Sequence, residues 1–398
     1  MKLQYLAIFS LVCSNPLLGT TTGYSSADYQ PLSAKKLVQV HLITRHGVRY
    51  PTLDNFQAHL DIVQQIQSSP AINSTIDLNY GPLSNAGMLH PSGKQSVQSY
   101  GQRFQARYSS LLDDPSKFFT SSSNVPRVLD TASSFFIGMK GTELPNGVIQ
   151  DRTLDADNDM NKSCKKYVSL PKNKKEASTF EKEYLPNLAD KLNNKLDMEL
   201  NTTQASTLLD ACAFQIAFGM NPNESFCSQF DSDDFSNYQL NDDFSKFYTL
   251  SYGLDAPFNS QLGCSLVTDI YNNINNQSLT ASFHFGHAET IIPLITSLGL
   301  LRDSQLLTTQ SPNLADRKFK TGLFAPMQAN LVFEVYENND LRLVLNEAPI
   351  DIPGCTDSTG LCAFNKFLEI YHNVVGCDFD SICENASTTI GGSNGNTN

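Results

Sequence analysis

LVQVHLITRHGVRYP, residues 37–51, is the most informative part of this 398-residue chain. Leu37–Thr44 is β-branched and largely apolar, which predicts a buried central strand. The strand runs into Arg45-His46-Gly47, and binding loops of α/β sheets emerge at the carboxyl ends of strands. Guanidinium groups engage two phosphate oxygens at once, and a neutral imidazole between them can attack phosphorus. The sequence therefore predicts an α/β sheet that carries a site for phosphoryl transfer.

A second group of reactive side chains lies much later in the chain. His287-Ala288-Glu289 stands between a strand predicted over Ala281–Gly286 and a helix predicted over Thr290–Leu298. His287 can hydrogen-bond a transferred phosphoryl group, and Glu289 can protonate the leaving oxygen. The helix start also offers backbone N–H groups to an anion, that of Ala288 included. A surface loop with ordinary arginines is the competing interpretation of the earlier motif, and this second half-site weakens it.

Strands and helices alternate in the rest of the chain. A helix is predicted over residues 92–108, a strand over 118–120, a helical segment over 127–137 and a hairpin over 330–345. Helical patterns dominate residues 151–254. The fold class is therefore α/β, with a mostly helical insertion domain.

Composition excludes several classes of protein. The 28 basic and 40 acidic residues leave a net charge of −12, which argues against nucleic-acid partners and against adhesion to anionic membranes. Apolar residues make up 40% of the chain and charged residues 17%, which excludes a disordered protein. An anionic ligand must therefore bind in a local basic pocket.

Residues 1–21 are predicted to be a secretory signal peptide. Lys2 is followed by an apolar run from Leu6 to Cys13, and Asn15-Pro16 ends that run before small and polar residues. The run is too short to span a bilayer. A buried N-terminal helix is the alternative, which the Ser/Thr-rich continuation disfavours. The mature chain is expected to begin near residue 22.

Removal of that signal leaves eight cysteines, an even number that predicts disulfides in an exported chain. Three pairs are close in sequence and the fourth is left by elimination: Cys212–Cys227, Cys355–Cys362, Cys377–Cys383 and Cys164–Cys264. Eight cysteines allow 105 arrangements, so other pairings stay open. The chain has no CxxC pair or HExxH segment, and no metal site is expected.

Six Asn-x-Ser/Thr sequons agree with passage through a glycosylating pathway. They begin at Asn73, Asn161, Asn201, Asn223, Asn276 and Asn385. Residues 386–398 form a tail of flexible composition, with neither a retrieval signal nor a hydrophobic anchor. The expected location is the secretory pathway, ending in secretion or in an endosomal or lysosomal lumen, without a stable membrane anchor.

Arg45–Pro51, RHGVRYP, resembles the N-terminal RHGxRxP motif of the histidine acid phosphatases. Leu89–Tyr108 resembles the family's helix that ends in Arg-Tyr. Arg127, with the segment that follows it, resembles the family's third phosphate-binding arginine. The resemblance covers most of residues 37–383.

The later motif distinguishes branches of that family. Fungal phytases and most acid phosphatases carry His-Asp there, whereas Gly286–Leu300, GHAETIIPLITSLGL, resembles the multiple inositol polyphosphate phosphatases. The segment Cys212–Cys227 and the pair Cys377 and Cys383 resemble that branch as well.

The resemblance implies a phosphoglycerate-mutase-like (histidine phosphatase) α/β core over residues 22–150 and 255–385. His46 would become the phosphohistidine, Glu289 would donate the proton, and His287 would stabilise the transition state. The residues expected to bind the phosphoryl oxygens are Arg45, Arg49, Thr52, Arg127 and Ala288. No cofactor and no metal are expected, because the arginines supply the positive charge.

The implied substrates are small-molecule polyphosphates: inositol hexakisphosphate, other inositol polyphosphates and 2,3-bisphosphoglycerate. Six lysines of the insertion are candidate contacts for the phosphates that do not react: Lys162, Lys165, Lys166, Lys172, Lys174 and Lys175. A solvated lysine-rich face without a ligand is the alternative. Alternative functions are a broad-specificity secreted or lysosomal acid phosphatase and a non-catalytic phosphate-binding ectodomain. A mutase is disfavoured by the cysteines and the signal segment.

Overall fold

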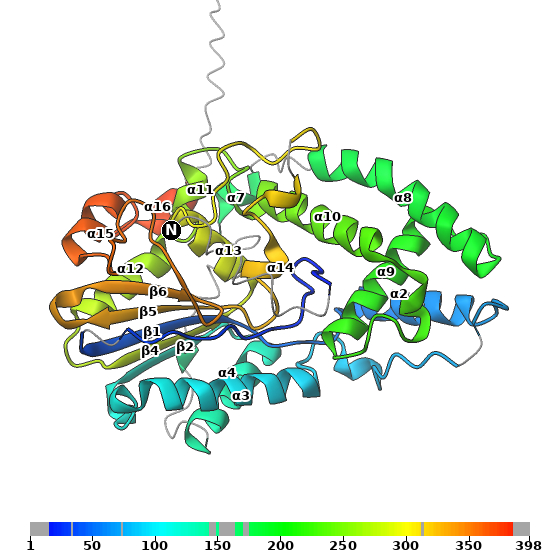
Figure 1. Cartoon of the computed structure of the whole chain (residues 1–398). Helices are drawn as coiled ribbons and strands as arrows, with labels where there is room; N and C mark the ends of the chain where they lie inside the picture. The colour runs from blue at the N-terminus through cyan, green and yellow to red at the C-terminus, as the bar shows by residue number, and fades with distance from the viewer. Residues whose placement is uncertain are drawn as a thin grey trace, which may run out of the picture.

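The computed structural model describes residues 16–32, 35–72, 75–142, 149–150, 164–169, 175–311 and 314–384. A mixed sheet runs through the described part of the chain in the order β3-β2-β4-β1-β5-β6-β7 (Figure 1). Its strands are β1 (Leu37–Arg45), β2 (Phe118–Ser122), β3 (Ile149–Gln150), β4 (Ala281–Gly286), β5 (Asn330–Tyr336), β6 (Leu341–Leu345) and β7 (Ala348–Ile350). Neighbours among β1 to β4 are parallel, and β5 to β7 continue the sheet in antiparallel pairs.

β1 is the central strand that its apolar sequence predicts. It lies between β4 and β5, and its residues from Gln39 to Arg45 are buried. Helices cover a parallel strand on both faces, which explains its nearly continuous apolar run. The register pairs Arg45 with Gly286, so the residues that follow β1 and β4 emerge side by side.

Helices cover both faces of the sheet (Figure 1). α3 (Pro91–Tyr108) and α4 (Pro126–Lys140) pack against one face, and α12 (Cys264–Asn275) and α13 (Ala288–Ser297) pack against the other. α3 buries Val97, Tyr100, Phe104 and Tyr108, whose helical spacing underlies its prediction from the sequence. These layers form the predicted α/β core.

A group of helices, here called the helical lobe, stands beside the sheet (Figure 1). It contains α8 (Lys175–Leu196), α9 (Thr202–Ala217) and α10 (Ser232–Leu250), all within the predicted insertion, and α2 (Leu53–Ile66). α2 packs against α9 and shares its apolar core, and Leu18 joins the same core. The lobe thus includes residues from outside 151–254, and the domain boundaries stay a prediction.

Several short helices complete the described structure. The helices are α7 (Lys165–Ser169), α11 (Phe258–Gln261), α14 (Thr321–Phe324), α15 (Phe364–Tyr371) and α16 (Phe379–Glu384). Within the described ranges, no helix combines the length and the apolar sequence that crossing a membrane requires.

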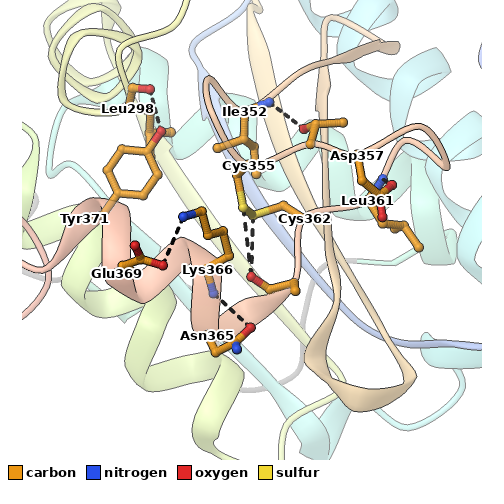
Figure 2. The surroundings of a disulfide bond; sticks show 12 residues. Leu298, Ile352, Cys355, Asp357, Leu361, Cys362, Asn365, Lys366, Glu369 and Tyr371 are labelled. Atoms are coloured by element: carbon orange, nitrogen blue, oxygen red, sulfur yellow. Dashed lines mark hydrogen bonds and ion pairs between the residues drawn. A yellow bond between two sulfur atoms is a disulfide. The ribbon is translucent and has the colours of Figure 1, made fainter.

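The eight cysteines of the described residues all form disulfides, but two of the four predicted pairs are wrong. The pairs Cys212–Cys227 and Cys355–Cys362 form as predicted, and Figure 2 shows the second beside α15. The predicted pairs Cys377–Cys383 and Cys164–Cys264 are replaced by Cys164–Cys383 and Cys264–Cys377. The cause is the path of the last segment, which returns so that α16 lies against α7. Each of its two cysteines therefore meets a partner from a distant part of the chain.

Two histidines are buried inside the parallel part of the sheet. His41 of β1 and His284 of β4 have no exposed surface, and their Nδ1 atoms lie 2.9 Å from the hydroxyls of Ser282 and Ser121. Burial, reinforced by the neighbouring His284, lowers the pKa of His41 to about 3. His41 therefore stays neutral in the folded protein through the mildly acidic range, in which an unfolded chain protonates its histidines.

We expect the free energy of unfolding to fall as the pH drops below about 6.5, because unfolding lets His41 bind a proton that the folded sheet excludes. His41→Asn keeps a polar group near Ser282 and removes this titration. Between about pH 7.5 and 4.5, the variant should lose roughly 2–3 kcal/mol less stability than the wild type. Urea unfolding followed by circular dichroism measures the difference. Identical pH dependence in both proteins would contradict the role of His41.

Candidate active site

The candidate active site lies where β1, β4 and β2 end at one edge of the sheet. β1 continues into the Arg45–Pro51 loop, β4 into His287, and β2 into Ser123 and then α4. The backbone N–H of His46 donates to the carbonyl of Gly286 (2.9 Å), which ties the first loop to the end of β4. Ligands of α/β proteins bind beyond the carboxyl ends of adjacent parallel strands.

The Arg45–Pro51 loop packs closely against the start of α3, at two glycines. A Cβ added to Gly93 would lie 2.2 Å from the carbonyl oxygen of Val48. A Cβ added to Gly47 would lie 2.9 Å from a methyl group of Val97. Only glycine permits this approach, which gives the side chains of the loop a fixed backbone.

His46 is held as a neutral imidazole. Its side chain is buried, and its Nδ1 lies 2.8 Å from the carbonyl oxygen of Gly47. Because a carbonyl only accepts, Nδ1 carries the proton and Nε2 keeps its lone pair. Burial, and then the charges of Arg45 and Arg127, lower the pKa of His46 well below its ordinary value. An imidazole in this state is equipped to be a nucleophile.

Arg45 and Arg127 are only partly satisfied by the protein. Nη1 of Arg45 donates to the carbonyl oxygens of Thr20 (2.6 Å) and Ala325 (2.8 Å). The Nε atoms of Arg45 and Arg127 are buried and find no acceptor among the described residues. Burial lowers the pKa of each guanidinium to about 10, so both stay charged at neutral pH. Charged donors buried without acceptors indicate a binding site for an anion.

Arg49 connects the site to the helical lobe. Its Nη1 donates to the carbonyl oxygen of Tyr50 (2.8 Å), and its Cζ lies 5.5 Å from the ring centroid of Phe214 on α9. The second distance is typical of a cation–π contact. Burial lowers the pKa of Arg49, and the negative charge of Asp210 opposes that effect. The structure thus brings all three predicted arginines into electrostatic contact with His46.

His287 lies beside His46, as the two half-sites predict. The ring centroids are 5.4 Å apart, with 75° between the ring planes. Nδ1 of His287 is 3.4 Å from Nη2 of Arg127, and Nε2 is 3.1 Å from the hydroxyl of Ser123. Because a guanidinium only donates, Nδ1 accepts and Nε2 carries the proton. Burial and Arg127 lower the pKa of His287 to about 3, so the ring is a neutral hydrogen-bonding group.

Glu289 lies in the first turn of α13, next to Lys246 of α10. Nζ of Lys246 is 3.6 Å from a carboxylate oxygen of Glu289. Burial would raise the pKa of Glu289, but Lys246, His287 and Arg45 together lower it. In the free protein Glu289 is therefore an anion. A bound phosphate would oppose the effect of Lys246 and Arg45 and make protonation of Glu289 easier.

The other predicted phosphate contacts lie at varying depth. Ala288 is buried in the first turn of α13, and Thr52 is the exposed residue before α2. Lys165 and Lys175 are exposed, and Nζ of Lys166 lies 4.9 Å from the ring centroid of Phe258. Lys162, Lys172 and Lys174 lie outside the described residues, as do residues 1–15 and 386–398.

Three of the six predicted glycosylation sites lie within the described residues. Asn201, Asn223 and Asn276 are exposed. Asn73, Asn161 and Asn385 lie outside the described residues.

Three side chains of the site were missed by sequence reasoning. They are Ser123, Thr131 and Lys246. Thr131 accepts the backbone N–H of Gly47 (3.1 Å) and donates to the carbonyl of Arg127 (2.7 Å), so it links the two arginine-bearing segments. None of the three belongs to a recognisable motif, and only the folded chain brings them to the site. The described residues contain no group of three histidine, cysteine or acidic side chains arranged to hold a metal ion.

Comparison with known families assigns this chain and its fold to a class. The model of the histidine phosphatase superfamily (branch 2) matches residues 36–346, and the chain belongs to this family. The predicted fold class is therefore confirmed, and the protein is a phosphatase of the histidine acid phosphatase family.

The individual relatives and solved structures carry three kinds of name. The thiamine-repressible acid phosphatase pho4 of Schizosaccharomyces pombe is 27% identical, over 88% of this chain and 86% of its own length. Multiple inositol polyphosphate phosphatase 1 of Gallus gallus is 25% identical, over 91% and 87%. The phytase of D. castellii superimposes with a TM-score of 0.78 at 18% identity, over 92% of this chain and 87% of that one. The Bifidobacterium longum multiple inositol polyphosphate phosphatase, in complex with inositol hexasulfate, superimposes with a TM-score of 0.69 at 17% identity. The match covers 89% of this chain and 97% of that one.

Proposed function

We propose that this protein hydrolyses inositol hexakisphosphate and related inositol polyphosphates through a phosphohistidine at His46. The observation that carries the proposal is the meeting of a neutral, oriented imidazole with buried arginine donors that have no acceptor among the described residues. Such donors bind a phosphoryl group, and the imidazole attacks it. Disulfides and exposed sequons support passage through the secretory pathway.

In the first step, Nε2 of His46 attacks the phosphorus of a phosphomonoester. A P–N bond forms, the P–O bond to the alcohol breaks, and Glu289 gives its proton to the leaving oxygen. The guanidiniums of Arg45, Arg49 and Arg127 stabilise the charge that develops on the phosphoryl oxygens.

In the second step, a water molecule attacks the phosphohistidine. The ionised Glu289 takes a proton from this water, the P–N bond breaks, and inorganic phosphate leaves. His46 returns to the neutral state with its proton on Nδ1. Both steps use the same carboxyl group, first as acid and then as base.

The substrate assignment rests on charge and on the names of relatives. A polyphosphate needs cations beyond those that bind the reacting group, and Lys246 is a partly buried cation next to Glu289. Relatives of this chain include multiple inositol polyphosphate phosphatases, and solved phytases share its fold. Acid phosphatases are among its relatives as well, so a broad-specificity acid phosphatase is the alternative to test.

We expect kcat/KM for inositol hexakisphosphate to exceed that for a simple aryl phosphate, although the aryl ester has the better leaving group. Lys246→Met should lower kcat/KM for inositol hexakisphosphate by about tenfold or more and change the aryl ester much less. Because Lys246 lowers the pKa of Glu289, its removal should also move the pH optimum upward.

Lys366→Met is the matched control, because Lys366, like Lys246, forms an ion pair with a glutamate. Its partner is Glu369 (3.0 Å) on α15, in the surroundings of the Cys355–Cys362 disulfide (Figure 2). Initial rates with both substrates decide the question. Equal or higher kcat/KM on the aryl ester would reject the polyphosphate assignment and favour the acid phosphatase.

A further inference from the structure

Residues 17–23, LLGTTTG, form a compact turn that we call the amino-terminal hook. The backbone N–H of Leu18 donates to the hydroxyl of Thr22 (2.7 Å), which donates in turn to the carbonyl of Gly19 (2.7 Å). Leu18 is buried in the apolar core of the helical lobe. The hook is therefore an integral part of the fold.

The hook is bound to α10 through its backbone. The N–H of Gly19 donates to the amide oxygen of Gln239 (2.8 Å), and the N–H of Thr20 donates to the carboxylate of Asp242 (2.8 Å). Gly19 has φ of +57°, and a Cβ there would lie 2.5 Å from Cβ of Asp242. Only glycine fits this position without displacing Asp242.

The other side of the hook faces the active site. The carbonyl of Thr20 accepts Nη1 of Arg45 (2.6 Å), and the same Nη1 donates to Ala325 (2.8 Å). Asp242 fixes Thr20, and Thr20 fixes the guanidinium of Arg45. Two carbonyl acceptors on one nitrogen leave Nε of Arg45 buried and directed to other acceptors, and the phosphoryl group is the acceptor that the proposed function supplies.

We propose that the exported protein keeps the hook, that the signal peptide is removed before Leu17, and that Thr20 is a positioning residue for Arg45. This revises the expectation that the mature chain begins near residue 22. Hydrolysis of the peptide bond after Ser14 would satisfy the requirement for a small residue at the cleavage site and would leave the hook intact. The role of Thr20 rests on the proposed function, whereas the position of cleavage does not.

The first test maps the amino terminus. The full chain is exported from a eukaryotic host, freed of glycans and subjected to amino-terminal sequencing. We expect the mature protein to begin at or before Leu17, and at Asn15 if cleavage follows Ser14. An active exported protein that begins after Leu17 would overturn the proposal. This result does not depend on which phosphate ester is the substrate.

The second test separates positioning from stability. Gly19→Ala adds a methyl group that pushes on Asp242, whereas Gly141→Ala changes a glycine with φ of +76° and no atom of the described residues within 4 Å of the added Cβ. Inorganic phosphate serves as the probe of Arg45. We expect Gly19→Ala to raise the inhibition constant of phosphate and to lower kcat/KM, each by about tenfold or more, and Gly141→Ala to change neither.

A loss of folded protein without a change in these constants would indicate a structural role only and would overturn the positioning role. If Gly19→Ala is not exported, Asp242→Asn is the second variant, because it weakens the anchor of Thr20 without adding atoms. It should also raise the inhibition constant of phosphate and lower kcat/KM. Unchanged phosphate inhibition in a folded Asp242→Asn protein would overturn the positioning role. Failure of the proposed function would instead show as full turnover in a folded His46→Ala protein, whatever the amino terminus.

Discussion

Replacement of His46 by alanine is expected to lower kcat/KM for every phosphomonoester by at least about 10³-fold, or ~4 kcal/mol of transition-state stabilisation. In the proposed mechanism, the variant keeps the arginines that bind the ester but lacks the nitrogen that forms the P–N bond. Steady-state rates measure the loss. A rapid quench into alkali with radiolabelled substrate should trap a phosphoenzyme in the wild type and none in the variant.

His372→Ala is the matched control, because His372 is exposed and its Nδ1 lies 2.9 Å from the carbonyl oxygen of Glu369 at the end of α15. This variant should keep wild-type rates. Circular dichroism should give the same spectrum for His46→Ala and the wild type. Normal turnover in a folded His46→Ala protein would exclude His46 as the nucleophile. A wild type that binds inositol hexakisphosphate without turnover would favour the non-catalytic phosphate-binding ectodomain.

Replacement of Glu289 by glutamine should separate substrates according to their leaving groups. An alkoxide needs a proton as the P–O bond breaks, whereas an acidic phenol leaves without one. We expect kcat/KM, which reports the steps through formation of the phosphohistidine, to fall by about 10²–10⁴-fold on inositol hexakisphosphate and much less on an activated aryl ester. The acidic limb of the aryl-ester pH profile should also flatten, since the titrating carboxyl is gone.

Glu369→Gln supplies the control, because that carboxylate is 70% exposed. Within the described residues its ion pair is with Lys366. Its rates should match the wild type on both substrates. Equal losses on every substrate in Glu289→Gln would argue that Glu289 binds or orients the ester without transferring a proton.

Much of the core could be predicted from the sequence because its signals are local. The apolar run of β1, the hairpin of β5 and β6, and the spacing of aromatic residues in α3 each lie within a short window. The two half-sites could be joined because both follow strands, and parallel strands end at one edge. Because Arg45 pairs with Gly286, the residues that follow the two strands lie side by side.

The features that the sequence did not reveal depend on contacts between distant segments. The disulfides of Cys164 and Cys264 reach the last segment of the chain, and no local spacing encodes that path. Lys246 stands between Ser245 and Phe247 in α10, outside any motif, and its approach to Glu289 follows from helix packing alone. The hook is rich in threonine and glycine, so its sequence resembles the end of a signal peptide. In the structure, however, its backbone is hydrogen-bonded to α10.

The position of β1 in the sheet also sets the order in which the protein can be built. Its two neighbours, β4 and β5, are translated long after it, and at ordinary ribosomal speeds β5 follows β1 by roughly 15 to 60 s. During that interval the apolar segment of β1 has neither of its strand partners, and unpaired apolar strands are prone to misassembly. The sheet edge that carries the candidate site is therefore complete only near the end of synthesis, and a chain that stops before Tyr336 contains His46 and Glu289 but lacks a complete β5.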